Sequence, residues 1–202
     1  MKRSTFAGAA LAASFGVASV CAHAEAVSRT PERGEPQRIV SLNVCADQIL
    51  LDLVARQRIR AVSFLAADPS VSAVADKARG IAWTRGSAEE VLALEPDLVI
   101  AGEHSTPAAV ALLERLGLNI LKVPTVSDLA GVRSVTRQIA RATRTEAQGE
   151  ALLAEFDRRL AASAATSSAS AGPPTAVIYQ VNNLSSGPGT LADAVLRAAG
   201  FI

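Results

Sequence analysis

Side chains able to bind metal or to catalyse are few among the 202 residues of this chain, and they are scattered along it. Only two histidines are present, His23 and His104. A zinc or manganese site needs several histidine, aspartate or glutamate ligands that converge on the ion. We therefore predict no metal centre, and we do not expect a bare metal ion to be the ligand.

No arrangement typical of an enzyme stands out either. The chain has no G-x-S-x-G nucleophile motif. Asp47 and Asp52 are five residues apart on a predicted helix and do not share a face. The segment Gly187-Pro188-Gly189-Thr190 lacks the Gly-Lys-Ser/Thr of a phosphate loop, so a turn followed by a threonine helix cap is the simpler interpretation. These observations favour a binding protein without a cofactor of its own, with an exported α/β enzyme as the alternative.

Trp83 and Arg85 form the most distinctive pair of side chains. Trp83 is the only tryptophan, and both residues fall in a predicted loop. An indole beside a guanidinium can contact a large flat or anionic ligand. A half-buried core tryptophan explains Trp83 equally well, because tryptophan is intermediate between buried and exposed residue types.

Two adjacent glutamates, Glu89 and Glu90, lie in the first turn of a short helix predicted within GSAEEVLALEPDLVIAG. Ser87 and Glu90 have the spacing of a capping box, in which the glutamate side chain reaches back to the helix start. Glu89 also favours the helix dipole, by about 0.3–1 kcal/mol. Glu89 therefore either stabilises the helix only or contacts a partner.

Short apolar strands alternate with helices in the first two thirds of the chain. The strands are predicted at residues 38–41, 60–63, 98–101 and 119–123. Strands and helices joined by short links form a parallel sheet with both faces covered. We assign residues 37–144 to an N-terminal α/β lobe of this kind.

The loops that could contact a ligand follow from the predicted sheet. Ligands of open parallel sheets bind outside the carboxyl ends of the strands. This rule selects the loops at Asn43, at Phe64 and at His104 as candidates, in addition to Trp83 and Arg85.

The pattern changes after the first lobe. Residues 145–164 predict one long helix of about 30 Å, which suits a spacer between two lobes. Residues 165–174 are of low complexity and predict a loop. A strand and a helix return in residues 175–202, too few elements to bury their own apolar faces. We therefore expect an α/β protein with a parallel-sheet N-terminal lobe, a long interlobe helix and an incomplete, truncated second α/β lobe.

The first 24 residues have the features of a secretory signal peptide. Lys2 and Arg3 precede an apolar run, and Ala22-His23-Ala24 fits a cleavage site. Residues 25–36 are polar, contain two prolines, and predict a disordered lead. We expect an exported, periplasmic protein that does not span the membrane.

Charge and cysteine content narrow the choice of partners. Without the signal peptide the chain has 18 basic residues and 19 acidic ones. A nucleic-acid-binding surface requires a basic stripe, so nucleic acid is excluded as a partner. Cys21 leaves with the signal, and Cys45 then has no partner for an internal disulfide. Its apolar surroundings predict a buried and inert thiol.

Two stretches resemble the periplasmic substrate-binding proteins of ABC importers for iron chelates and cobalamin. They are RIVSLNVCADQILLDL near the start of the lobe and GSAEEVLALEPDLVIAG in its middle. The resemblance covers about residues 37–202, judged by the order of elements. It implies two lobes joined by a single helix, with the ligand in the cleft, and delivery of that ligand to a permease and its ATPase. It also implies a metal chelate as ligand: a ferric siderophore, haem or cobalamin.

The resemblance further implies roles for individual residues. In this family, a glutamate on each lobe meets an arginine of the permease. Glu89 matches the glutamate of the first lobe, whereas Gly189 stands where the second is expected. A tryptophan spaced like Trp83 faces the cleft in cobalamin-binding members. For a monomeric binding protein we predict these ligand contacts: Asn43, Phe64, Trp83, Arg85 and His104. A haem- or corrinoid-handling protein that does not dock a transporter is the remaining alternative.

Overall fold

A computed structural model describes residues 34–166 and 174–202, which belong to one compact unit. The predicted signal peptide, most of the predicted lead and residues 167–173 of the predicted loop lie outside the described residues. Residues 25–36 were predicted to be a disordered lead, and this prediction is wrong for residues 35 and 36. Pro36 is buried, and Glu35 forms an ion pair with Arg58 at 2.6 Å.

Five parallel strands form the central sheet in the order β3-β2-β1-β4-β5. Their bounds are β1 (Ile39–Ser41), β2 (Ile59–Ser63), β3 (Ala82–Thr84), β4 (Leu98–Gly102) and β5 (Ile120–Val123). The parallel α/β fold is confirmed, but the predicted number of four strands is wrong because β3 was missed. Ala82 and Trp83 are exposed, so this strand lacks an apolar run, and its extended form depends on pairing with β2.

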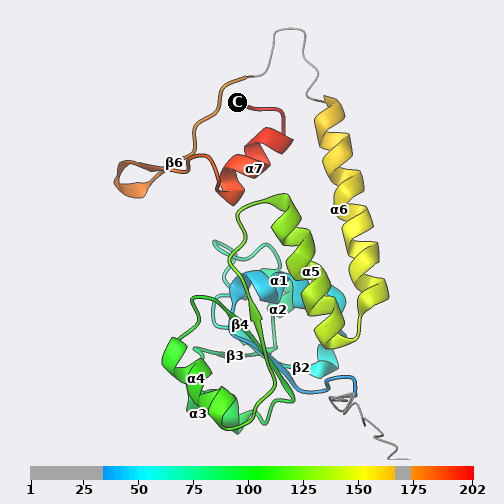
Figure 1. Ribbon diagram of the computed structural model, residues 1–202, viewed down its shortest axis with the longest axis vertical. Helices are drawn as coiled ribbons and strands as arrows, with labels where there is room; N and C mark the ends of the chain where they lie inside the picture. The colour runs from blue at the N-terminus through cyan, green and yellow to red at the C-terminus, as the bar shows by residue number, and fades with distance from the viewer. Residues whose placement is uncertain (1–33, 167–173) are drawn as a thin grey trace, which may run out of the picture. The chain divides into compact units, whose positions relative to one another are not determined.

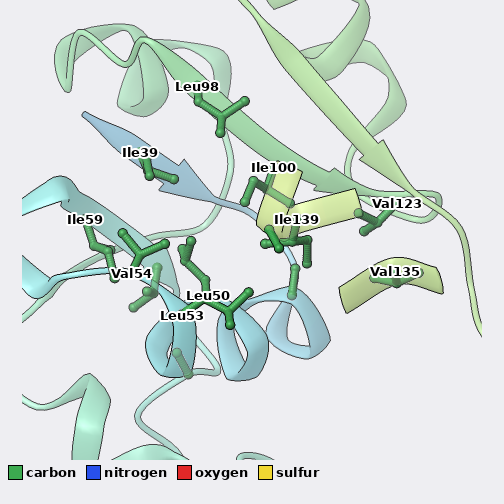
Figure 2. Close-up of a cluster of buried hydrophobic side chains, with 14 of the residues drawn as sticks. Ile39, Leu50, Leu53, Val54, Ile59, Leu98, Ile100, Val123, Val135 and Ile139 are labelled. Carbon is green, nitrogen blue, oxygen red and sulfur yellow. The ribbon is translucent and has the colours of Figure 1, made fainter. Parts of the chain in front are cut away.

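Helices cover both faces of the sheet. They are α1 (Val44–Leu53), α2 (Ala75–Ala78), α3 (Ala88–Ala93), α4 (Pro107–Arg115) and α5 (Leu129–Thr143), with a short 3₁₀ turn η1 (Arg56–Arg58) before β2. Successive strand residues point to opposite faces, which divides the core into two layers. Ile39 and Ile100 pack with Leu50 of α1 and Ile139 of α5 on one face (Figure 2).

The second core layer lies on the other face of the sheet. Val40 and Val99, the strand neighbours of residues in the first layer, pack there with Val91 of α3 and Leu113 of α4. Each of these four side chains is fully buried. The alternation of apolar contacts along β1 and β4 thus fixes which helices lie on which face.

The predicted long helix is present as α6 (Glu146–Thr166), which packs along α5 (Figure 1). Leu153 is the buried contact on its inner side. Two arginines of α5 hold its outer side: Arg133 donates to Asp157 at 3.0 Å, and Arg137 donates to Glu150 at 2.7 Å. The helix is therefore fixed to the first lobe along its first three turns, and its role as a spacer between lobes stays a prediction.

The segment after residue 174 contains a hairpin of β6 (Tyr179–Gln180) and β7 (Leu184–Ser185), joined by η2 (Val181–Asn183), and the helix α7 (Leu191–Ala198). The strand predicted within residues 175–202 is present only as the short β6, and it pairs antiparallel with β7 and not in a parallel sheet. The predicted cap of α7 is confirmed, since the Thr190 hydroxyl accepts the Asp193 N–H at 3.2 Å. No residue of α7 is buried.

Candidate ligand-binding site

The carboxyl ends of the five strands meet at one edge of the sheet, because all strands run in the same direction. Along this edge Arg85 follows β3, Phe64 follows β2, Asn43 follows β1 and His104 follows β4. The chain adds β2 and β3 on one side of β1, and then β4 and β5 on the other. A reversal of this kind opens a crevice at the strand ends, where ligands of open α/β sheets bind.

Three of the predicted site residues come together at this edge. The guanidinium carbon of Arg85 lies 5.1 Å from the centre of the Trp83 ring and 5.7 Å from that of Phe64. These are cation–π distances. Trp83 remains 56% exposed and Phe64 48% exposed. We call Phe64, Trp83 and Arg85 the aromatic–arginine cluster. The interpretation of Trp83 as a half-buried core residue is wrong, since strand β3 presents its ring to solvent.

The backbone beneath the cluster is held by Glu90. Its carboxylate accepts the Thr84 hydroxyl at 2.5 Å and the Arg85 N–H at 2.8 Å. Hydrogen bonds from Thr84 and Arg85 lower the pKa of Glu90. The Ser87 hydroxyl accepts the Glu90 N–H at 3.2 Å, as predicted for a capping box. The Glu90 carboxylate also reaches back to the backbone N–H groups of Gly86 and Ser87, the contact predicted for the helix start. Its bonds to Thr84 and Arg85 extend this cap to the end of β3 and so position Arg85.

Glu90→Gln is expected to cause a small loss of thermal stability at neutral pH. The native pKa of Glu90 is lowered, so the ionised carboxylate stabilises the fold above its ordinary pKa, and this stabilisation disappears as the pH falls through the native value. The gap between the melting temperatures of wild type and variant should therefore close on acidification. Glu89→Gln, one residue earlier and exposed, is the control; it removes a charge of the same first turn without the bonds to Thr84 and Arg85, so its closure should be the smaller one. A gap that stays constant with pH would contradict the role of the Glu90 charge.

Asn43 and His104 lie at the same edge, but no contact among the described residues joins them to the cluster. The Asn43 side chain caps α1 by accepting the Ala46 N–H at 3.0 Å. It also packs against Gly102, where an added Cβ would fall 2.2 Å from the Asn43 amide nitrogen. His104 is exposed in the turn after β4. Asn43 thus has a structural role, and ligand contact by either residue stays a prediction.

Asp47 is a buried carboxyl group beneath this edge that was not selected from the sequence. Its Oδ2 accepts the Ser63 N–H at 3.1 Å and the Ser63 hydroxyl at 2.5 Å. Its Oδ1 has no hydrogen-bond partner among the described residues. Burial raises the pKa of Asp47 to about 6, against the opposing effect of hydrogen bonds from Ser41 and Ser63. Asp47 precedes Leu50 by three residues, and this helical spacing onto the inner face of α1 was the available signal.

The prediction of a buried thiol at Cys45 is wrong, because Cys45 is free and exposed. Ala46, Asp47, Leu50 and Leu53 make the buried face of α1. Cys45 precedes that face by one residue, about 100° around the helix axis, and is turned to solvent.

The docking candidate Glu89 is exposed in the first turn of α3. Gly189, where a second docking glutamate was expected, has a φ of +81°. This left-handed conformation strains any residue with a Cβ. The backbone here thus favours the glycine that the sequence carries.

Within residues 34–166 and 174–202, no three histidine, cysteine, aspartate or glutamate side chains gather as metal ligands. No helix in these two ranges combines the length and the apolar content needed to cross a bilayer.

The parallel sheet, the helices on both of its faces and the long helix α6 define an α/β fold of the kind found in periplasmic binding proteins. Residues 39–202 match the Periplasmic binding protein family, and the chain belongs to that family.

Known relatives agree with this assignment. The chain is 28% identical over 167 residues to a cobalamin-binding protein of Halobacterium salinarum (strain ATCC 29341 / DSM 671 / R1), covering 82% of this chain and 45% of the relative. It is similar to the periplasmic haem-binding protein BhuT in complex with two haems, with 26% identity, a TM-score of 0.66, and coverage of 83% of this chain and 66% of BhuT.

A possible iron-binding, periplasmic solute-binding protein of Staphylococcus epidermidis ATCC 12228 shares the fold, with a TM-score of 0.71 at 18% identity. The match covers 83% of this chain and 66% of that structure. The chain therefore spans about half the length of the curated relatives it matches and about two thirds of these solved structures.

Proposed function

We propose that this protein is the periplasmic solute-binding component of an ABC importer, and that it captures a metal chelate without catalysing a reaction. The ligand class is that of a ferric siderophore, haem or cobalamin. Membership of the family and the cobalamin- and haem-binding relatives support this proposal. The observation that carries it is the aromatic–arginine cluster, which is exposed at the edge where the carboxyl ends of the strands meet.

The chemistry of the cluster fits a flat, conjugated and anionic chelate. Indole and phenyl faces stack on a conjugated ring, and a guanidinium pairs with a carboxylate or phosphate oxygen. The Arg85 guanidinium already lies against both rings, and Glu90 holds its backbone, so little side-chain entropy remains to be lost on binding. A ligand of this class carries its own metal, which is consistent with a protein that needs no cluster of metal-binding side chains.

Docking to a permease is the part of the proposal that distinguishes an importer component from a haem- or corrinoid-handling protein without a transporter. We propose Glu89 as the docking residue of this lobe. It is exposed and one residue away from Glu90, yet the described hydrogen bonds to the site involve Glu90 and not Glu89. Its side chain is therefore free to pair with an arginine of a partner.

Glu89→Gln is expected to leave the affinity for the chelate unchanged and to abolish stimulation of the transporter. Truncating one partner of a charge pair that is desolvated on docking costs about 2–5 kcal/mol of binding. If Glu89 only favours the helix dipole, the change costs at most about 1 kcal/mol of stability and spares transport. The measurement is ATP hydrolysis by the permease and ATPase in vesicles, alongside chelate affinity.

Glu146→Gln is the matched control, because Glu146 is likewise an exposed acid in the first turn of a helix. This variant should stimulate ATP hydrolysis as wild type does. Normal stimulation by Glu89→Gln would refute the docking role and favour the alternative without a transporter. Turnover of a substrate by the purified protein would favour the exported enzyme instead.

A further inference from the structure

Three buried polar side chains lie directly beneath the ligand-binding edge: Ser41 at the end of β1, Ser63 at the end of β2, and Asp47 on α1. Their exposed fractions are 0%, 5% and 0%. Ser41 is two residues before Asn43, and Ser63 is one residue before Phe64. Asp47 accepts two hydrogen bonds from Ser63, and Ser41 lies close enough to its carboxyl group to lower its pKa.

We propose that Asp47 is a positioning residue, which through Ser41 and Ser63 sets the strand ends that carry Asn43 and Phe64, and does so in a pH-dependent way. Within this proposal, only the effect of Asp47 on chelate affinity rests on the proposed function. The arrangement of the strand ends themselves can be tested without a ligand.

The hydroxyl of Ser41 is the group that responds to the proton on Asp47. It donates to the Asn43 carbonyl oxygen at a long 3.4 Å, while Asp47 Oδ1 has no partner. A proton on Oδ1 gives the carboxyl a donor, which the Ser41 oxygen can accept while it keeps its bond to Asn43. When this proton leaves to solvent, buried Oδ1 needs a donor, because an unpaired buried charge is costly. The Ser41 hydroxyl then turns toward Oδ1 and releases the Asn43 carbonyl.

Among the described residues, no charged side chain nearby controls the protonation of Asp47. Burial and the two serines account for the shift in the pKa of Asp47, with no contribution from a charged side chain in the described part of the chain. Arg60 of β2 and Cys45 of α1 are exposed. Four charged side chains of α1, η1 and α5 pair elsewhere: Asp52 with Lys77, Arg58 with Glu35, Arg133 with Asp157 and Arg137 with Glu150. Arg56 donates to the carbonyl oxygens of Lys77 and Arg79, and Arg141 is exposed.

The change at Asp47 reaches the aromatic–arginine cluster through Ser63. Phe64 follows Ser63 directly, and its N–H donates to the Thr84 carbonyl oxygen at 3.0 Å. Phe64 also contacts Arg85, which lies against Trp83. Trp83 is the only tryptophan of the chain, so its fluorescence reports on this cluster alone.

The test is a titration of Trp83 emission in the full chain without ligand, between about pH 5 and pH 7.5. Wild type should show a shift of the emission maximum with a midpoint near pH 6. Asp47→Asn should show none. A variant with both histidines replaced, His23→Gln and His104→Gln, should keep the shift, because the transition does not belong to imidazole.

Ser41→Ala provides a second variant in case Asp47→Asn does not fold. The Ser41 hydroxyl stabilises the ionised carboxylate, so its loss should move the midpoint to higher pH. The proposal is overturned if wild-type emission does not change with pH, if the shift persists in Asp47→Asn, if it vanishes with the histidines, or if Ser41→Ala leaves the midpoint in place.

Haemin serves as the probe for the consequence at the site. Its affinity for wild type should change across the same midpoint, and its affinity for Asp47→Asn should not. Absence of haemin binding at every pH would count against the proposed function, while the ligand-free titration would still decide the role of Asp47. Haemin affinity that is constant with pH in wild type would overturn the consequence for the site, because the strand ends would then not influence this ligand.

Discussion

Arg58→Met is expected to lower the free energy of unfolding by about 3 kcal/mol, because each buried acceptor left unsatisfied costs about 1–3 kcal/mol. The Arg58 guanidinium donates to the Pro36 carbonyl oxygen at 2.7 Å and to the Thr143 carbonyl oxygen at 2.6 Å. Thr143 is the last residue of α5, and its carbonyl has no partner within the helix. Arg58 therefore joins the chain before β1 to the end of α5.

Urea denaturation followed by circular dichroism measures this loss. Arg60→Met is the matched control, since Arg60 lies two residues further on and is exposed, and it should change stability by less than about 0.5 kcal/mol. Glu35→Gln should also have a small effect, because the Glu35 side chain is 51% exposed. Equal stability of Arg58→Met and Arg60→Met would show that the buried contacts of Arg58 contribute nothing.

Asp47→Asn is expected to stabilise the protein at neutral pH, by up to about 3 kcal/mol. The native pKa of about 6 is above the ordinary 3.8, so folding favours the protonated carboxyl. Its contribution to stability is complete below the ordinary value and is lost as the pH rises through the native one. Asparagine stays neutral and can still accept the two hydrogen bonds from Ser63, so it avoids this loss.

The measurement is the free energy of unfolding of wild type and Asp47→Asn at several pH values from about 5 to 7.5. The advantage of the variant should be small at the acidic end and should grow through pH 6. Asp76→Asn, at an exposed position of α2, is the control and should show no such growth. If Asp47→Asn is less stable than wild type at neutral pH, the native state holds an ionised and well-satisfied carboxylate.

The alternation of apolar strands and helices was sufficient to predict the parallel sheet, the long helix and the edge at which the strand ends meet. Buried strands such as β4 are visible in a sequence because they are uninterrupted apolar runs. Strand β3 is not, because two of its three residues are exposed and it exists through pairing with β2. Missing β3 also placed Trp83 in a loop, although its proximity to Arg85 was predicted correctly.

Contacts between residues far apart in the chain were the part that the sequence could not supply. Arg58 and Thr143 are 85 residues apart, and Asp47 and Ser63 are 16 apart, so no local spacing indicates either contact. The capping box at Ser87 was recognised from spacing, and Glu90 in addition binds Thr84 and Arg85 because β3 ends beside it. Glu90 thus caps its helix and also positions Arg85, and the second role does not follow from helix-capping rules.

Titration of the purified protein with haemin, cyanocobalamin and a ferric siderophore tests most directly whether the aromatic–arginine cluster binds a metal chelate. We expect at least one of the three to bind and to quench Trp83 fluorescence. Trp83→Leu and Arg85→Gln, followed by the absorbance of the chelate, should each weaken its binding about tenfold, the loss of one stacking or cation–π contact. Leu92→Ala, at an exposed position of α3, should bind as wild type does. Failure of all three chelates to bind, or unchanged affinity in both cluster variants, would contradict the proposed site.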